Sequence, residues 1–240
     1  SIPKAPYRCP PGPYERACQV AAYFKQAKPK SKVLVLDGNE DIVSKKGLFL
    51  AAWNELYKGI VEYRPNQEAK DVDARTMTVK TEFDSFKGDV LNVLPPMRAG
   101  DIAAQAKLIT ANNRWCGVDW QTMESVAAPG IHVLGDATLS APAMPKSGSM
   151  ANNHAKIAAS AIVATMTGQP VNAQPVINNT CYSYVSATEA MHVTSVHRYE
   201  AAQKTLVVVP GSGGVSAQRS ALEKQYADGW AINIWADSLG

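Results

Sequence analysis

Residues 32–63 have the sequence KVLVLDGNEDIVSKKGLFLAAWNELYKGIVEY, and this stretch decides the fold class. Lys32–Asp37 is a short run of valine and leucine, which is typical of a buried strand. Gly47–Lys58 has apolar residues at helical spacing, and Val61–Tyr63 returns to the pattern of a short strand. A strand, a helix and a second strand in this order predict parallel pairing and therefore an α/β layer.

The same reading extends outward along the chain. Tyr14–Lys28 has helical spacing, with Pro13 at a position where its missing N–H costs nothing. Further strands are predicted over residues 76–82, 89–94 and 131–134, and further helices over residues 102–108 and 148–166. A linker over 171–179 precedes a predicted small antiparallel sheet (181–185, 191–196, 205–209) and a last helix over 215–227, followed by a tail with Trp230 and Trp235.

Composition excludes several classes of protein. The chain has 240 residues, of which 46% are hydrophobic and 19% charged, so it can bury a real core and is not predicted to be disordered. No apolar run approaches the roughly 20 residues that span a bilayer, so no transmembrane segment is predicted. The net charge is only +3, and the densest basic cluster, Lys28–Lys32, is typical of a solvated loop. Nucleic acid is therefore not an expected partner.

The four cysteines are Cys9, Cys18, Cys116 and Cys181. Their spacing does not match that of a zinc site and the four histidines do not cluster with them, so no metal is expected. Four cysteines allow three complete disulfide connectivities, among which the spacing does not choose. Cys18 falls inside an apolar helical pattern and Cys116 follows a tryptophan, so both are predicted to pack in the core.

Cys9 has a distinctive setting. It lies in Arg8-Cys9-Pro10-Pro11-Gly12-Pro13, directly before the first predicted helix. The N–H groups and dipole of a helix N-terminus stabilise a thiolate, and Arg8 adds a positive charge. Three prolines make the loop stiff, which suits a sulfur that must be held in place. These features favour a reactive cysteine, and a purely structural cysteine is the alternative.

Two further motifs indicate ligand binding. Gly135-Asp136 follows the predicted strand 131–134, which puts a carboxylate at the carboxyl edge of a sheet, where it can accept hydrogen bonds from ribose or ribityl hydroxyls. Met144–Ser149 precedes the long helix, whose N-terminus suits an anion such as the pyrimidine edge of a reduced flavin. An ordinary helix cap by Ser147 or Ser149 is the alternative and is compatible with flavin binding.

Taken in order, Tyr7–Arg16, Gly135-Asp136, Pro145–Gly148 and Asn179-Thr180-Cys181 closely resemble the flavoprotein subunits of flavocytochrome c sulfide dehydrogenase. The resemblance covers essentially the whole chain. It implies an α/β fold like that of the disulfide-reductase-like flavoproteins, which have two dinucleotide-binding domains. In this chain that fold would be partial and would be followed by a small α+β interface domain. The implied domains are a pyridine-nucleotide-like domain that lacks its first strand (1–98), the second half of an FAD-binding domain (99–172) and the C-terminal interface domain (173–240).

The resemblance also assigns roles to residues. Cys9 and Cys181 match the two redox cysteines, which would form a disulfide over the flavin ring, and Glu15 matches the acid–base carboxylate. A first-turn acid that only stabilises the helix is the alternative for Glu15. The residues implied in FAD binding are Gly135, Asp136, Pro145, Lys146, Ser147 and Thr180.

The implied activity is oxidation of sulfide to sulfur or polysulfide, with FAD as cofactor and a c-type cytochrome subunit as electron acceptor. In such proteins hydrosulfide attacks the disulfide, giving a persulfide on one cysteine and a thiolate on the other. Exchange of this kind needs a good leaving thiolate, which the setting of Cys9 favours. A redox disulfide suggests an oxidising compartment, so we expect a periplasmic protein.

Two other functions stay open. An NADH-dependent flavoprotein disulfide reductase would need a nucleotide-binding turn, but no G-x-G-x-x-G is present, and prolines at 10, 11 and 13 remove N–H donors that a pyrophosphate needs. Because the family carries its G-x-G-x-x-G about 150 residues before the Cys9 motif, we expect this chain to be a C-terminal portion that is inactive alone. It would then be a fragment without FAD that self-associates through exposed sheet edges.

Overall fold

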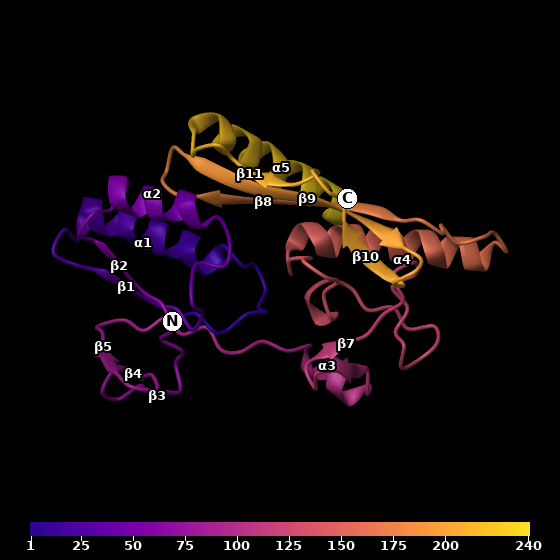
Figure 1. Cartoon of the computed structure of the whole chain (residues 1–240), viewed down its shortest axis with the longest axis horizontal. Helices are drawn as coiled ribbons and strands as arrows, with labels where there is room; N and C mark the ends of the chain where they lie inside the picture. The colour runs from indigo at the N-terminus through magenta and orange to yellow at the C-terminus, as the bar shows by residue number, and fades with distance from the viewer. The chain divides into compact units, whose positions relative to one another are not determined.

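A computed structural model describes all 240 residues and shows a mixed α/β chain (Figure 1). The chain divides into two compact units, which are described separately. The first unit comprises residues 1–96, 182–192 and 216–227, and the second comprises residues 97–181, 193–215 and 228–240. Strands β8 (Val176–Tyr184) and β9 (Ala190–Glu200) and helix α5 (Ala221–Leu239) contribute residues to both units. The three domains inferred from the resemblance stay a prediction.

The first unit is built on a parallel pair of strands. Strand β1 (Val33–Leu36) pairs in parallel with β2 (Val61–Arg64), and α2 (Lys46–Leu56) connects them. The strand–helix–strand order and parallel pairing predicted from residues 32–63 are therefore confirmed. The N-terminal segment extends this layer, because Ile2 accepts a hydrogen bond from the Gly38 amide and donates one to the Leu36 carbonyl.

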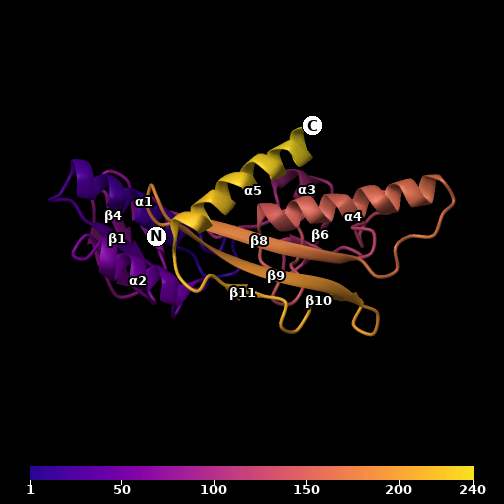
Figure 2. The same ribbon diagram turned by 90° about the horizontal axis from the view of Figure 1, so that it is seen from above.

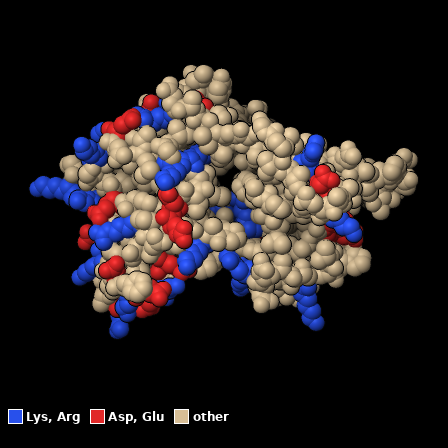
Figure 3. All heavy atoms as spheres, viewed as in Figure 1, with Lys and Arg blue, Asp and Glu red and all other residues tan.

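Aromatic side chains hold the helices of this unit against the strands. Helix α1 (Gly12–Ala27) buries Tyr14, and α2 buries Phe49 and Trp53. The Tyr14 and Phe49 ring centroids are 5.5 Å apart, and those of Trp53 and Tyr63 are 5.7 Å apart. Aromatic pairs at such distances stabilise a core beyond their burial, so they hold α1 against α2 and α2 against β2. On the visible surface of this unit, acidic and basic side chains are interspersed (Figure 3).

The rest of this unit differs from the sequence-based expectation. Three short strands, β3 (Asp71–Asp73), β4 (Thr78–Lys80) and β5 (Ser85–Lys87), form an antiparallel meander, so the strand predicted over 76–82 is shorter and has two neighbours. The buried strand predicted over residues 89–94 is wrong. Val90 is 85% exposed, and no strand pairs with this segment, whose Leu94 amide bonds to the Ser1 carbonyl.

In the second unit, α4 (Gly148–Met166) has the predicted bounds. The unit also contains α3 (Asp101–Gln105), an antiparallel pair of β6 (Ile109–Ala111) with β7 (Trp115–Cys116), and the short 3₁₀ helix η1 (Gly135–Ala137). The strand predicted over 131–134 is wrong, because a strand needs a paired neighbour along its length. Here His132 alone forms a β-bridge, with Glu124.

The last part of the chain forms the predicted small sheet and helix, with different bounds. Strand β9 pairs with β8, β10 (Thr205–Val208) and β11 (Gly214–Val215). Strand β8 begins at Val176, inside the predicted linker, and lies alongside α4 (Figure 2). Helix α5 begins six residues later than predicted and runs to Leu239, so Trp230 and Trp235 lie in a helix rather than in a tail. None of the helices has both the length and the apolar character needed to cross a membrane.

Candidate functional site

In the first unit, the Cys9 sulfur lies against the first turn of α1. Cys9 adopts a left-handed conformation with φ of 52°, and its carbonyl accepts a hydrogen bond of 2.8 Å from the Gly12 amide. A Cβ atom on residue 12 would lie 2.8 Å from the Cys9 Sγ, which is closer than packed atoms approach, so a larger residue there would displace the Cys9 side chain. The residue before the helix, Pro11, provides no side-chain cap. The sulfur therefore lies beside the positive end of the α1 dipole, a setting that favours the thiolate form of a cysteine.

Glu15 lies one turn into α1 and is half-buried. Its Oε1 accepts hydrogen bonds from the Tyr184 amide at 2.9 Å and from the Gln19 side chain at 3.3 Å. Burial raises the pKa of Glu15, and the Tyr184 amide, the Lys45 charge and the Ser183 and Gln19 side chains oppose that rise. The carboxyl group thus holds its proton to higher pH than an ordinary glutamic acid, as an acid–base group should.

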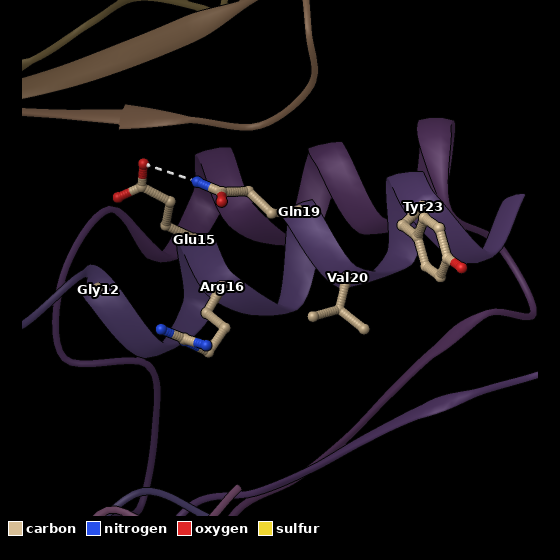
Figure 4. A pocket seen from close by; sticks show the side chains of 6 residues that line it. All are labelled: Gly12, Glu15, Arg16, Gln19, Val20 and Tyr23. Carbon is tan, nitrogen blue, oxygen red and sulfur yellow. Dashed lines mark hydrogen bonds between the residues drawn. The ribbon is translucent and has the colours of Figure 1, made fainter. Parts of the chain in front are cut away.

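A pocket of about 530 Å³ runs along the exposed face of α1. Figure 4 labels the residues that line it: Gly12, Glu15, Arg16, Gln19, Val20 and Tyr23. Because the pocket reaches Gly12, against which the Cys9 sulfur lies, it gives solutes access to the neighbourhood of the sulfur and the Glu15 carboxyl group. Arg16 provides a positive charge in this pocket that suits a small anion.

The acidic residue at the end of β1 is already occupied by protein donors. Asp37 is fully buried, and its Oδ2 accepts hydrogen bonds from the hydroxyls of Tyr14 at 2.7 Å and Tyr63 at 3.0 Å. Its Oδ1 accepts from the amide and the side chain of Asn39. In nucleotide-binding α/β units an acidic residue at this strand end binds the ribose. Asp37 is buried and internally bonded, so it is not available for that contact.

Cys18 and Cys116 are both buried, as predicted for packing residues. The Trp53 indole N–H donates to the Cys18 sulfur at 3.2 Å. Burial raises the pKa of Cys18 to about 12 and also raises the pKa of Cys116. Both thiols therefore stay protonated at neutral pH and are poor nucleophiles.

In the second unit, the Gly135-Asp136 motif forms η1 and packs against α4. Gly135 has φ of +59°, and its amide donates to His154 Nδ1 at 3.1 Å. A Cβ atom on residue 135 would lie 2.8 Å from the Cβ of Ala151. His154 is buried, and burial lowers its pKa to about 4, so at neutral pH its Nδ1 accepts this bond and its Nε2 carries the proton.

We expect Gly135→Ala to destabilise the folded state by about 2–4 kcal/mol, since it adds left-handed strain and a collision with α4. Gly148→Ala is the matched control, because a Cβ atom there meets no atom within 4 Å and its φ is not strained. Urea unfolding of the two variants measures the difference. Equal stabilities would contradict the packing described for residue 135.

The carboxylate of Asp136 has an unmet hydrogen-bonding requirement. Its Oδ1 is buried and has no partner, which is costly unless a donor is supplied. A ribityl or ribose hydroxyl is a donor of the right kind, so Asp136 fits a role in flavin binding. Close by, the Lys146 ammonium donates to the carbonyls of Asp136 at 3.0 Å and Thr138 at 2.5 Å. It lies 3.7 Å from the centre of the Trp115 ring, and burial lowers its pKa to about 8.

The start of α4 is tied to β8. Ser147 caps the helix by accepting from the Met150 amide at 3.1 Å, so the ordinary capping role is confirmed. The Ser147 hydroxyl also donates to Asn179 Oδ1 at 2.7 Å, and the Thr180 amide donates to the Ser149 hydroxyl at 3.2 Å. Pro145 precedes this cap and is half-buried. Contacts of these residues with a flavin stay predictions.

The structure thus gathers the predicted residues into two groups. Gly12 of the Cys9 motif and Glu15 meet at one pocket in the first unit. Asp136 and Lys146 are joined directly in the second unit, where Ser147 and Thr180 flank the same helix start. Cys9 belongs to the first unit and the half-buried Cys181 to the second, so their pairing stays a prediction.

Three residues that contact these groups were not foreseen: Lys45, Ser183 and His154. The sequence held a signal for His154 alone, because it shares the buried face of α4 with Met150 and Ile157 at helical spacing. Lys45 and Ser183 are brought together from positions 138 residues apart, and no local pattern indicates their contact.

Two family matches cover most of the chain. Residues 1–95 match the family described as Sulfide dehydrogenase (flavocytochrome c) flavoprotein chain, central. Residues 173–239 match the family described as Flavocytochrome c sulphide dehydrogenase, flavin-binding. The first match contains Cys9 and Glu15, and the second contains Thr180 and Cys181.

Solved structures provide a more distant likeness. One chain of the Tetrahymena thermophila mitochondrial ATP synthase F1Fo composite tetramer aligns with a TM-score of 0.59 and 19% identity, over 80% of this chain and 48% of that chain. Reduced Bacillus anthracis CoADR-RHD aligns with a TM-score of 0.43 and 11% identity, over 81% and 40%. The first likeness shows a shared fold alone. The chain spans less than half the length of either solved chain.

Proposed function

Because the chain belongs to the flavoprotein family of flavocytochrome c sulfide dehydrogenase, a family of flavin-dependent oxidoreductases, we propose that it carries out sulfide oxidation through a Cys9–Cys181 redox disulfide. The observation that carries this proposal is the placement of the Cys9 sulfur against Gly12 in the first turn of α1, since Gly12 and Glu15 line the same pocket. The products would be sulfur or polysulfide, and a c-type cytochrome subunit would accept the electrons.

The proposed chemistry is disulfide exchange. Hydrosulfide attacks one sulfur of the disulfide, so that the Cys9–Cys181 bond breaks, a cysteine persulfide forms and the other cysteine leaves as a thiolate. A second hydrosulfide attacks the persulfide, which releases the disulfane HSSH and leaves a second thiolate. The two thiolates then lose two electrons as the disulfide re-forms. Bound FAD would supply the acceptor for this electron pair and pass the electrons on to the cytochrome.

The protein groups have defined tasks in this scheme. The dipole of α1 and the exposed Arg16 would attract the anionic hydrosulfide and stabilise the leaving thiolate. Glu15 would take and return the proton of the sulfur species, for which its raised pKa is suited. Asp136 would bind a flavin hydroxyl through its unpartnered Oδ1, and Lys146 and Ser147, with Gly135, Pro145 and Thr180, would line the flavin.

Two observations favour sulfide over NADH as the reductant. The turn before α1 has prolines at positions 10, 11 and 13 and therefore lacks the N–H donors that bind a pyrophosphate. Asp37, at the strand end that would bind a ribose, is buried under Tyr14 and Tyr63. On the same proposal, the redox disulfide indicates an oxidising compartment such as the periplasm.

Anaerobic mixing of the flavin-loaded protein with sulfide or with NADH tests the proposal. We expect sulfide to bleach the absorption band of oxidised flavin and NADH to leave it unchanged. Bleaching by NADH alone would support a disulfide reductase instead. Failure of the chain to retain flavin would support the inactive, self-associating fragment, which sedimentation would reveal.

A further inference from the structure

Lys45 is placed in a way that is costly for a lysine. It is the residue before α2. Its backbone adopts the left-handed conformation with φ of 55°, which residues other than glycine rarely do. It is also only 6% exposed, although burying an ammonium group removes it from water. A strained and buried residue of this kind is kept in place only when specific contacts with its surroundings compensate for the cost. Such residues are frequent at functional sites.

The ammonium group of Lys45 is directed toward the Glu15 carboxyl group through one intermediate. Its Nζ donates to the Ser183 hydroxyl at 2.8 Å. Ser183 is fully buried, and its hydroxyl bonds in turn to the Glu15 side chain. Since a hydroxyl can accept one hydrogen bond and donate another, Ser183 connects the lysine of the α2 start to the carboxylate of α1.

We propose that Lys45, acting through the Ser183 hydroxyl, is a positioning residue that holds the Glu15 carboxylate in place and keeps it ionisable. This inference rests on the proposed function, in which Glu15 exchanges protons with the sulfur species. Burial raises the pKa of Glu15 and so favours the protonated form, which cannot accept a proton. The Lys45 charge lowers the pKa of Glu15 against the effect of burial and so favours the carboxylate.

The other groups that face Glu15 do not supply this charge. The Tyr184 amide and the Gln19 side chain are neutral donors. Cys18, on the same helix, is a buried thiol whose own pKa the Glu15 charge raises. Arg16 lines the same pocket but is exposed, so solvent screens its charge.

The test measures the pKa of Glu15 by ¹³C NMR of carboxyl-labelled glutamate, with the signal assigned by its loss in Glu15→Gln. We expect Lys45→Met and Ser183→Ala each to raise the pKa of Glu15, by about 1 for the loss of the charge. Lys45→Arg, which keeps the charge, should largely restore it. Lys46→Met is the matched control. It removes an equal charge from the next residue in the chain, whose side chain is exposed and pairs with Asp41.

If Lys45→Met does not fold, Ser183→Ala, which removes a single oxygen atom, decides the question. A pKa of Glu15 that stays unchanged in the folded Ser183→Ala and Lys45→Met proteins would overturn the inference. So would an equal rise in Lys46→Met, since the effect would then be one of net charge. A protein that shows the expected rise but does not oxidise sulfide would refute the proposed function and leave the link from Lys45 to Glu15 in place.

Discussion

Replacement of Cys9 by serine is expected to lower sulfide oxidation by at least about a thousandfold in the flavin-loaded protein, because the disulfide that hydrosulfide attacks can no longer form. Anaerobic, sulfide-dependent reduction of a c-type cytochrome measures this loss. The fold should tolerate the change, since Cys9 is exposed and the serine side chain is no larger. Flavin content should therefore match that of the unchanged protein, and so should urea unfolding when both proteins are reduced, because the disulfide itself adds stability to the oxidised form.

The partner cysteine provides a sharper form of the same test. If Cys9 and Cys181 act as one pair, Cys181→Ser should be as inactive as Cys9→Ser, and the double variant no worse than either. Cys18→Ala is the control, because that buried thiol packs against Trp53 and should affect stability rather than turnover. Substantial sulfide oxidation by Cys9→Ser, or losses that add in the double variant, would contradict the proposed disulfide mechanism.

Elements with strong local patterns were predicted well from the sequence. Helix α4 has the predicted bounds because its apolar residues repeat at helical spacing and Ser147 gives a clear cap signal. The parallel pair of β1 and β2 followed from a run of valine and leucine before a helix and a short strand pattern after it. The segments 89–94 and 131–134 have similar apolar runs but no neighbouring strand along their length, and pairing is a property of the fold rather than of the run.

The candidate site was predictable only in part for a related reason. Cys9, Glu15 and Gly135-Asp136 stand in recognisable motifs, and their roles in catalysis and flavin binding stay predictions. The contact between Lys45 and Ser183 joins residues far apart in the chain, and Lys45 stands among polar loop residues where a solvated side chain is the ordinary expectation. Its burial depends on tertiary contacts, which cannot be predicted from the neighbouring residues in the sequence. Those contacts place this lysine next to the site.

Glu15→Gln is expected to lower sulfide oxidation by about 10²–10⁴-fold, the usual contribution of a general acid–base group. The amide keeps the size of the carboxyl group and can still accept from the Tyr184 amide, but it cannot take up a proton. Glu40→Gln, at an exposed glutamate, is the control and should leave turnover unchanged. Activity within about tenfold of the unchanged protein would mean that Glu15 only stabilises the helix.

The same variant should show that this site is held at a cost to stability. Burial raises the pKa of Glu15 in the folded state, so protonated Glu15 stabilises the fold more than ionised Glu15 does. This contribution to the free energy of unfolding is complete at pH values below the unfolded-state pKa and is lost as the pH rises through the folded-state pKa. Glutamine does not lose a proton, so the stability of Glu15→Gln relative to the unchanged protein should increase as pH is raised from about 4 to about 8. Urea unfolding across this range measures the difference. A relative stability that does not change with pH would show that Glu15 titrates as an ordinary surface carboxyl group. A rise together with the loss of turnover would show that the fold keeps a destabilising carboxylate beside the Cys9 loop for its chemistry.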